Sequence, residues 1–248
     1  MKTAVIIQAR VGSTRLPRKV LLPLGGQTVL SRVIDRVRLA NRVDQVVVAT
    51  TDQPADDAIA QEAERCRTTV CRGSESDVLD RYHLAASACN ASTIVRITSD
   101  CPLVDPQLLD RMLMRFQHAS NASGPIDYLS NVHPRTFPHG LDIEIFTREV
   151  LSIAHREAEQ AHQREHVTPF FYENPSRFRL QNVTQAVDQS AFRWTLDEPA
   201  DQTFFEAVFR HFDDKQFVTT QSVIDLLSRY PELARLNAHV QQKGLRAA

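Results

Sequence analysis

The chain has 248 residues, of which 29 are Lys or Arg and 30 are Asp or Glu, so its formal net charge is −1. This balance excludes the broad positive field that non-specific nucleic-acid binding requires. No run approaches the roughly 20 apolar residues of a membrane-spanning helix, so we expect neither a nucleic-acid nor a membrane partner. A chain of this length can enclose one large core, and we predict a single domain over residues 1–240 with a loosely ordered tail over 241–248.

The four cysteines are Cys66, Cys71, Cys89 and Cys101. They form no CxxC pair, and the first apolar run is too short for a secretory leader. We therefore expect no zinc site and no disulfide framework, and a cytoplasmic location.

Short β-branched runs alternate with helical segments in the first half of the chain. The runs are Ala4–Ile7, Gln45–Thr50, Thr68–Cys71 and Thr93–Thr98. Apolar residues at helical spacing predict helices over Val29–Val37 and Val78–Ala86. Because parallel strands buried on both faces read as continuous apolar runs, this half is predicted to be a doubly wound, mostly parallel α/β sheet.

The second half is predicted to be an elaboration of that sheet. We expect a loop rich in His, Pro and Arg at 132–140 and two helices from residue 201 onward. The expected strands are Ile126–Asn131, Leu141–Phe146, Phe178–Asn182 and Phe192–Leu196, and the expected helices between them are Arg148–Glu159 and Arg164–Glu173.

The first strand runs into a basic loop, residues 8–19, whose composition indicates a phosphate-binding site. Its candidate nucleotide-binding residues are Gln8, Ala9, Arg10, Gly12, Ser13, Thr14, Arg15 and Lys19. The glycine lets the backbone approach a ligand closely, the hydroxyls donate hydrogen bonds, and the three basic side chains can neutralise a triphosphate. The loop begins at the carboxyl end of a strand, where open α/β sheets bind ligands. It matches neither GxxxxGK[ST] nor GxGxxG, so a different phosphate-binding family is expected.

Two aspartates are candidates for holding a divalent cation. Asp100 follows the run Ile94–Ile97, so we expect its carboxylate at the carboxyl end of a strand, beside the phosphate loop. Mg²⁺ takes one or two carboxylates and completes its shell with water and substrate phosphate oxygens, so Asp100 and Asp197 would suffice. Alternatively, either aspartate caps a following helix, because Asp accepts hydrogen bonds from backbone N–H groups there.

The N-terminal loop resembles the opening of the acylneuraminate and Kdo cytidylyltransferases, with the closest likeness to their SpsF-like branch of spore coat polysaccharide biosynthesis. The likeness covers about residues 3 to 210. It continues through the segments Gly73–Tyr82, Arg96–Leu103, Gly140–Glu144, Arg164–Pro169 and Trp194–Pro199.

The resemblance implies a GT-A/nucleotidyltransferase-like fold, CTP as the nucleotide, Mg²⁺ as the cofactor and a homodimer. It matches Asp100 to the family's first metal-binding aspartate and Asp197 to the aspartate of a late Asp-Thr-Pro-Glu-Asp segment. Here Glu198 replaces the threonine of that segment and Ala200 its glutamate.

Relatives recognise the base near residues 73–81, which makes Gly73, Ser74 and Arg81 candidates for nucleotide contacts. Cytosine needs one acceptor and one donor to be read, and backbone groups with Arg81 or Ser74 could supply them. Alternatively, Asp77 caps the helix that follows and Asp80 pairs with Arg81 on its solvated face.

Polar residues of the second half are candidates for binding the acceptor. They are Asn131, Arg135, His139, Asp142, Glu144, Arg164 and His166. Asp142 and Glu144 alternate with apolar residues, so both are expected on one strand face, which is either a substrate surface or a solvated face.

We therefore predict transfer of CMP from CTP to a sugar acid or other anionic acceptor, with release of pyrophosphate, for surface polysaccharide or glycoconjugate biosynthesis. Arg10, Arg15, Lys19 and Asp100 are the expected catalytic residues, and His139 is a candidate general base. The alternatives are a nucleotide-sugar glycosyltransferase and a non-catalytic nucleotide-binding protein. Residues 99–101 read Ser-Asp-Cys and lack the second aspartate of the DxD motif usual in glycosyltransferases.

Overall fold

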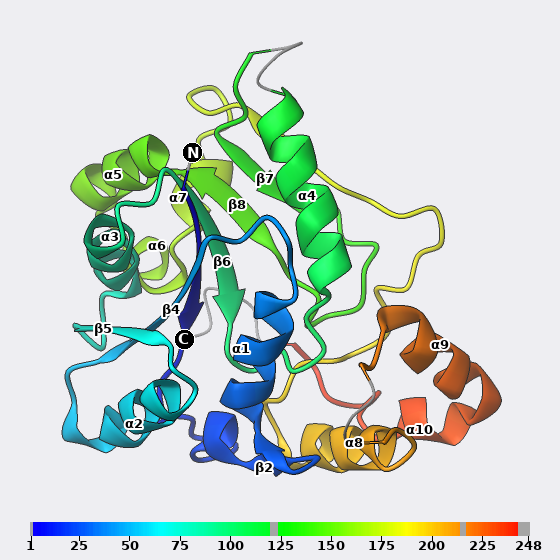
Figure 1. Ribbon diagram of the computed structural model, residues 1–248. Helices are drawn as coiled ribbons and strands as arrows, with labels where there is room; N and C mark the ends of the chain where they lie inside the picture. Colours follow the sequence, from blue (N-terminus) through cyan, green and yellow to red (C-terminus); the bar gives the residue numbers. More distant parts are fainter. Residues whose placement is uncertain (1, 120–123, 214–216, 243–248) are drawn as a thin grey trace.

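The computed structural model describes residues 2–119, 124–213 and 217–242. Its centre is a seven-stranded sheet (Figure 1). In spatial order the strands are β5 (Thr69–Gly73), β4 (Gln45–Thr51), β1 (Thr3–Gln8), β6 (Thr93–Thr98), β8 (Glu144–Thr147), β7 (Tyr128–Ser130) and β9 (Leu180–Asn182). The first four are parallel, and β8 runs antiparallel to both of its neighbours. A separate hairpin joins β2 (Pro23–Leu24) to β3 (Gln27–Thr28).

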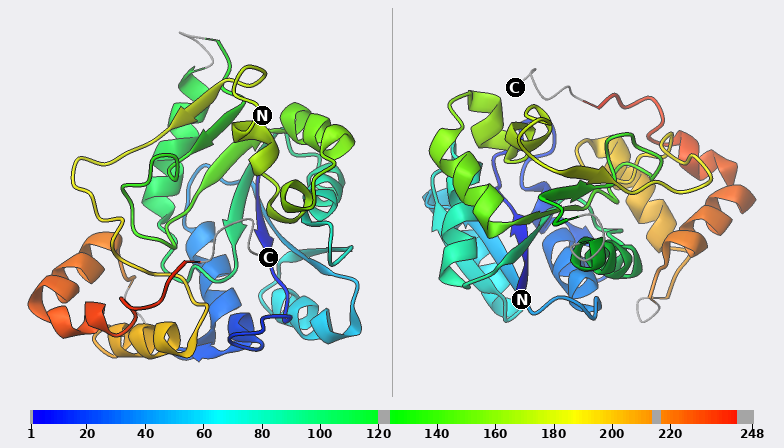
Figure 2. Two further views of the ribbon diagram at one scale, coloured as in Figure 1. Left: turned by 180° about the vertical axis from the view of Figure 1, so that it is seen from behind. Right: turned by 90° about the horizontal axis from the view of Figure 1, so that it is seen from above.

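Helices cover both faces of the sheet, as the two views of Figure 2 show. One face carries α1 (Val29–Arg38), α2 (Asp57–Arg65), α4 (Pro106–Ala119), α8 (Pro199–Phe209) and α9 (Thr220–Arg229). The other carries α3 (Val78–Ala88), α5 (Arg148–Glu157), α6 (Ala161–His166) and α7 (Pro169–Tyr172). The remaining helices of the described residues are η1 (Lys19–Leu21), η2 (Pro54–Asp56) and α10 (Pro231–Arg235).

The alternation of side chains along β1 explains the two cores. Ala4 and Ile6 pack against α3, while Val5 and Ile7 pack into the cluster that includes α1 and α4. All four side chains are fully buried, as expected for a central parallel strand. The predicted mostly parallel, doubly wound α/β fold is thereby confirmed.

The predicted strand over residues 141–146 begins only at Glu144. The buried side chain of Asn131 takes the place of a ladder partner before that point. Its amide donates to the carbonyl of Leu141 at 2.7 Å and accepts from the backbone N–H of Ile143 at 2.9 Å. Asp142 therefore lies outside the strand, and the expected two-carboxylate face with Glu144 does not form.

Three other predicted elements differ from the structure. The helix expected over residues 164–173 is two short helices, because Val167 adopts a φ of 70° and Pro169 starts a new helix. Residues 192–196 form no strand and make only an isolated bridge between His139 and Arg193. Within the described residues, three helices rather than two follow the late segment, starting at Pro199.

No helix in the described part of the chain is both long and apolar enough to cross a membrane. Residues 243–248 of the predicted tail lie outside the described residues. Gln242 accepts a hydrogen bond from Arg193 at 2.6 Å, so the described end of the chain contacts the segment before α8.

We predict that Gly140→Ala destabilises the protein by at least about 1–3 kcal/mol. Gly140 has a φ of +98°, and an added Cβ would lie 2.0 Å from the backbone oxygen of Trp194. Urea unfolding would measure the loss. Gly12→Ala is the matched control, because its Cβ would meet only the Glu75 side chain, at 3.5 Å. Equal stability of the two variants would contradict the proposed role of this close approach.

Candidate active site

A cleft of about 460 Å³ opens at the carboxyl ends of β1 and β6. Because these strands are parallel neighbours, the loop after Gln8 and the turn after Thr98 emerge at the same edge of the sheet. Fourteen of the predicted site residues line the cleft: Gln8, Ala9, Arg10, Gly12, Ser13, Thr14, Arg15, Lys19, Arg81, Asp100, His139, Asp142, His166 and Asp197.

The backbone of the phosphate loop is fixed by its own neighbourhood. The N–H of Val11 donates to the buried carboxylate of Asp56 at 2.7 Å, and the N–H of Leu16 donates to the Ser13 hydroxyl at 3.3 Å. Arg18 adopts a left-handed conformation, with a φ of 57°, immediately before η1. The loop therefore has a defined shape that directs Lys19 into the cleft.

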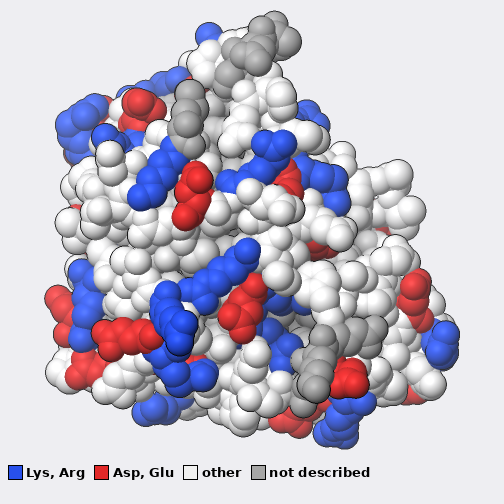
Figure 3. Space-filling model, in the orientation of Figure 1, with Lys and Arg blue, Asp and Glu red and all other residues white. Residues whose placement is uncertain are grey.

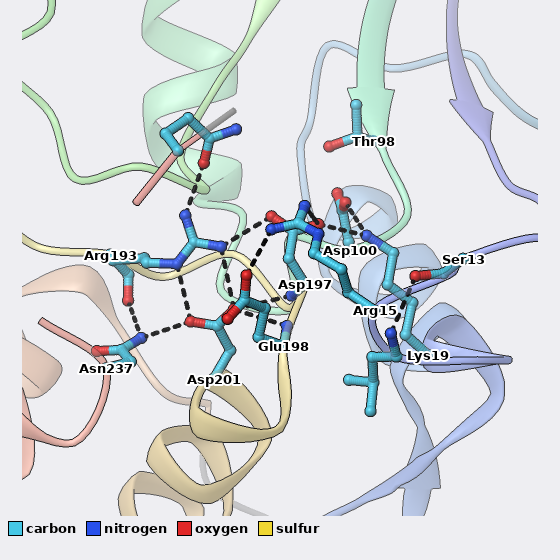
Figure 4. A network of polar contacts seen from close by, with 12 residues as sticks. Ser13, Arg15, Lys19, Thr98, Asp100, Arg193, Asp197, Glu198, Asp201 and Asn237 are labelled. Atoms are coloured by element: carbon cyan, nitrogen blue, oxygen red, sulfur yellow. Dashed lines mark hydrogen bonds and ion pairs between the residues drawn. The ribbon is translucent and has the colours of Figure 1, made fainter. Parts of the chain in front are cut away.

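Lys19 joins the two candidate metal ligands (Figure 4). Its Nζ donates to Oδ2 of Asp100 at 2.6 Å and to Oδ1 of Asp197 at 2.7 Å. Burial alone would lower the pKa of Lys19, but the two carboxylates outweigh burial and raise it. Burial alone would raise the pKa of Asp100, but the charge and hydrogen bond of Lys19 lower it to about 2. The ammonium of Lys19 and the carboxylate of Asp100 are thus charged at neutral pH.

A buried hydrogen-bond network fixes Asp197 through the carboxylate oxygen that does not contact Lys19 (Figure 4). Arg193 donates to Oδ2 of Asp197 at 2.8 Å and to Asp201 at 2.9 and 3.0 Å. Asp201, which is fully buried, also accepts the N–H groups of Asp197 and Glu198, and Asn237 donates to it at 2.9 Å. The sequence prediction missed Arg193 and Asn237, although the spacing of Glu198 and Asp201 matches a capping box.

The alternative that Asp100 or Asp197 serves as a helix cap is wrong. Asp105 accepts the N–H groups of Gln107 and Leu108 at the start of α4, and Glu198 is the N-cap of α8. The two aspartates are therefore left for the cleft.

The remaining cations of the loop differ in how firmly they are held. Arg15 pairs with Glu198 at 2.8 Å and lies 3.6 Å from Asp197. The side chain of Arg10 is 45% exposed and makes only long ion pairs, with Glu75 at 3.8 Å and Glu165 at 3.9 Å. Of the three loop cations that line the cleft, Arg10 is thus the most available to a ligand.

Arg81 is a buried cation without a carboxylate partner among the described residues. The residue is 2% exposed, and its guanidinium donates to the carbonyl of Ala49 at 3.3 Å. Its Nε has no partner, and burial lowers its pKa. The alternative of an Asp80–Arg81 pair is therefore wrong, since Asp80 contacts His155 at 2.9 Å.

The other alternative for this segment is right in one respect, because Asp77 caps α3 by accepting the N–H of Asp80. The two other nucleotide candidates in the segment do not line the main cleft. Ser74 lies in a neighbouring hollow, next to Ser76, and Gly73 ends β5 against the stem of Arg81.

Four of the acceptor candidates do not line the cleft because their side chains have structural partners. Asn131 bonds to residues 141 and 143, and Arg135 pairs with Asp142. Glu144 is buried between Arg96 and Tyr128, each at 2.5 Å. Arg164 pairs with Asp77 at 2.5 Å and donates to the carbonyl of His155, which ties α6 to α3 and α5.

His139 also lines the cleft. Its backbone N–H and carbonyl bond to Phe192 and Trp194, which ties it to the segment that carries Asp197. Burial, with Arg135 nearby, lowers the pKa of His139, so its imidazole is neutral at pH 7 and can accept a proton.

The carboxylates of Asp100 and Asp197 fit a divalent cation of the Mg²⁺ type. Both present an oxygen to one point, now contacted by Lys19. In the described residues no group of three or more His, Cys, Asp or Glu side chains could hold a metal. Two carboxylates with the remaining positions left to water and phosphate are the set that Mg²⁺ uses with nucleotides, and Zn²⁺ would require more protein ligands.

The surface charges agree with a small-molecule site. On the face shown in Figure 3, basic and acidic side chains lie next to one another and form no broad field of one sign. The cleft itself is lined by charges of both signs: Arg10, Arg15, Lys19, Arg81 and Arg96 lie there with Asp100, Asp142, Glu165 and Asp197.

A basic loop and an aspartate meet at the carboxyl ends of adjacent parallel strands, which is the arrangement that the sequence predicted for a nucleotidyltransferase. The chain belongs to the cytidylyltransferase family, whose model matches residues 4–243. It is 34% identical over 237 residues to the spore coat polysaccharide biosynthesis protein SpsF of Bacillus subtilis, covering 92% of this chain and 95% of SpsF.

Two solved structures share the fold of this chain. A cytidylyltransferase from Leptospira borgpetersenii superposes with a TM-score of 0.89 at 34% identity, covering 98% of this chain and 99% of the other. A CMP:2-keto-3-deoxy-manno-octonic acid synthetase in complex with CTP shares the fold, with a TM-score of 0.66 at 18% identity over 85% of this chain and 99% of the other.

We predict that Lys19→Met costs about 3–5 kcal/mol of stability at pH 7 in the presence of a chelator, because two buried carboxylates lose their shared counter-charge. The pKa of Asp100 lies below its ordinary 3.8, so the pair stabilises the protein above about pH 4 and loses this contribution as the pH falls toward 2. In the variant, protonation of Asp100 removes its repulsion of Asp197. The difference in the free energy of unfolding between variant and wild type should therefore narrow as the pH falls.

Urea unfolding at pH 7 and pH 4 would test this. Arg18→Met is the control, because Arg18 is exposed and adjacent in sequence but does not line the cleft. A deficit that is the same at both pH values would argue against the charged pair.

Proposed function

We propose that this cytidylyltransferase transfers CMP from CTP to a sugar acid or a similar anionic acceptor, with Mg²⁺ as cofactor and release of pyrophosphate. An acceptor oxygen attacks the α-phosphorus, a new P–O bond forms, and the bond to the β-phosphate oxygen breaks. The observation that carries the proposal is the convergence of Lys19, Asp100 and Asp197 beside the phosphate loop.

The protein residues act mainly by position and charge. Arg10 and Arg15 neutralise the β- and γ-phosphates, and Lys19 offsets the charge that develops on the leaving pyrophosphate. Asp100 and Asp197 would hold Mg²⁺, which when bound would polarise the α-phosphoryl oxygens. Because the Asp56 carboxylate fixes the loop backbone, little reorganisation is needed when the nucleotide binds.

Arg81 is the proposed reader of the base. It is a buried cation without an ion pair, next to the backbone of Ala9, since the N–H of Ala9 and a guanidinium N–H share the carbonyl of Ala49. Cytosine presents two adjacent acceptors, O2 and N3, and a guanidinium can donate to both.

The acceptor is proposed to bind on the other side of Asp100, next to His139, Asp142 and His166, which line the cleft. His139 can take the proton of an acceptor hydroxyl, and the Arg135 pair holds Asp142 in place to receive hydroxyl groups. The similarity to SpsF supports a role in surface polysaccharide biosynthesis. The homodimer, the cytoplasmic location and the single domain stay predictions.

We expect pyrophosphate to be released from CTP, in the presence of Mg²⁺, by one or more members of a panel of sugar acids. Asp100→Asn should lower turnover by at least about 100-fold, as loss of an electrostatic group at the reacting phosphate does. Asp110→Asn is the control, because Asp110 only binds the backbone and side chain of Asn41 and the backbone of Arg42 on the surface.

Two results would overturn this assignment. A product that depends on a UDP-sugar and forms without pyrophosphate would indicate a glycosyltransferase. Unchanged turnover in Asp100→Asn would remove the carboxylate from the catalytic group.

We predict that Arg81→Met weakens CTP binding by roughly 10- to 150-fold, the usual effect of losing hydrogen bonds from a charged donor. The folded protein should stay as stable or become more so, because a buried unpaired charge is removed. Calorimetric titration with CTP would measure the affinity. Arg111→Met, on the exposed surface of α4, is the matched control. If CTP bound both variants equally, Arg81 would have no part in recognition.

A further inference from the structure

Lys19 occupies the one point toward which both candidate metal ligands direct an oxygen. Its Nζ lies 2.6 Å from Oδ2 of Asp100 and 2.7 Å from Oδ1 of Asp197. The second oxygen of Asp197 is already bound to Arg193 at 2.8 Å, so only Oδ1 is left to face the cleft. An ammonium and a divalent cation would need the same two oxygens.

The two cations cannot share this position. Like charges at contact distance repel strongly where little water screens them. Little water reaches this point, because the side chains of Lys19, Asp100 and Asp197 are only 13%, 20% and 10% exposed. A divalent cation can bind both carboxylates only after the ammonium has moved away.

The side chain of Lys19 can reach new partners by rotation alone. Its backbone is fixed at the start of η1, where its N–H donates to the carbonyl of Leu16 and its carbonyl accepts from Leu22. The flexible four-carbon stem can turn without movement of the loop. Gly12 and Ser13 line the same cleft, where a triphosphate would offer new oxygen partners.

We propose that Lys19 is an exchangeable counter-ion. In the free enzyme it neutralises Asp100 and Asp197. When the divalent cation binds, Lys19 moves to the nucleotide phosphates. The inference rests on the proposed function, since it takes these aspartates as metal ligands. Its consequence is that the metal binds poorly by itself, because it must displace Lys19 before any phosphate is present to receive the ammonium.

The test is Mn²⁺ binding in the absence of nucleotide, followed by electron paramagnetic resonance, for wild type, Lys19→Met and Arg18→Met. Removing the competing ammonium should tighten Mn²⁺ binding by about 5- to 150-fold in Lys19→Met, the usual range for coupling between two binding events. Arg18→Met removes the same charge one residue away and should bind Mn²⁺ as wild type does.

A second variant and a second readout cover the possibility that Lys19→Met folds poorly. Lys19→Gln keeps a hydrogen-bond donor but no charge, and Mg²⁺ should raise its melting temperature more than that of wild type, by mass action. Tighter binding in both Lys19 variants supports the exchange. Equal Mn²⁺ affinity in wild type and the Lys19 variants would refute it and leave the metal site intact. If Asp100→Asn bound Mn²⁺ as tightly as wild type, the proposed metal ligands themselves would be wrong.

Discussion

The buried contact between Arg193 and Asp201 is the interaction on which the active site depends. Asp197 lies on a segment without regular secondary structure, far in sequence from Asp100, and such a segment has no ladder to fix it. Asp201 supplies the fixation by accepting the N–H groups of Asp197 and Glu198, while Arg193 holds the carboxylate of Asp197. The close approach of Gly140 to Trp194 and the bond from the N–H of Leu196 to the carbonyl of Asp100 then bring the two metal candidates together.

The energetic balance of the cleft follows from this arrangement. Burying an unpaired carboxylate is costly, and Asp197 is tolerated because Lys19, Arg193 and, at a longer distance, Arg15 surround it. At Arg81 the balance of charge is the opposite: a cation is buried, and no carboxylate of the described residues forms an ion pair with it. The cleft is therefore neutralised around Lys19 and, among the described residues, keeps a buried cation without an ion pair at Arg81.

The sequence predicted the part of the site that depends on strand edges. Continuous apolar runs identified the parallel strands, and the rule that ligands bind at their carboxyl ends predicted that residues 8–19 and Asp100 lie together, as the bond from Lys19 to Asp100 confirms. The alternation of polar and apolar residues could not separate β8 from the irregular segment before it. In that segment the side chain of Asn131 makes the hydrogen bonds that a neighbouring strand would otherwise make. Arg193 and Asp201 were missed as partners because two opposite charges eight residues apart outside a helix look like separate surface charges. The pair fixes the active site because it is buried, and burial depends on tertiary packing.

The loop can stay rigid while the side chain of Lys19 moves, because the contacts that fix the loop are made by its backbone and not by that side chain. Asp56 and the turn before η1 hold the backbone, so the loop keeps its shape whichever anion Lys19 contacts. The change between two charge arrangements then needs only side-chain rotation, whose entropic cost is about 2 kcal/mol or less, far below the cost of reordering a loop of twelve residues. The proposed exchange of an internal counter-ion for a metal therefore needs no domain movement.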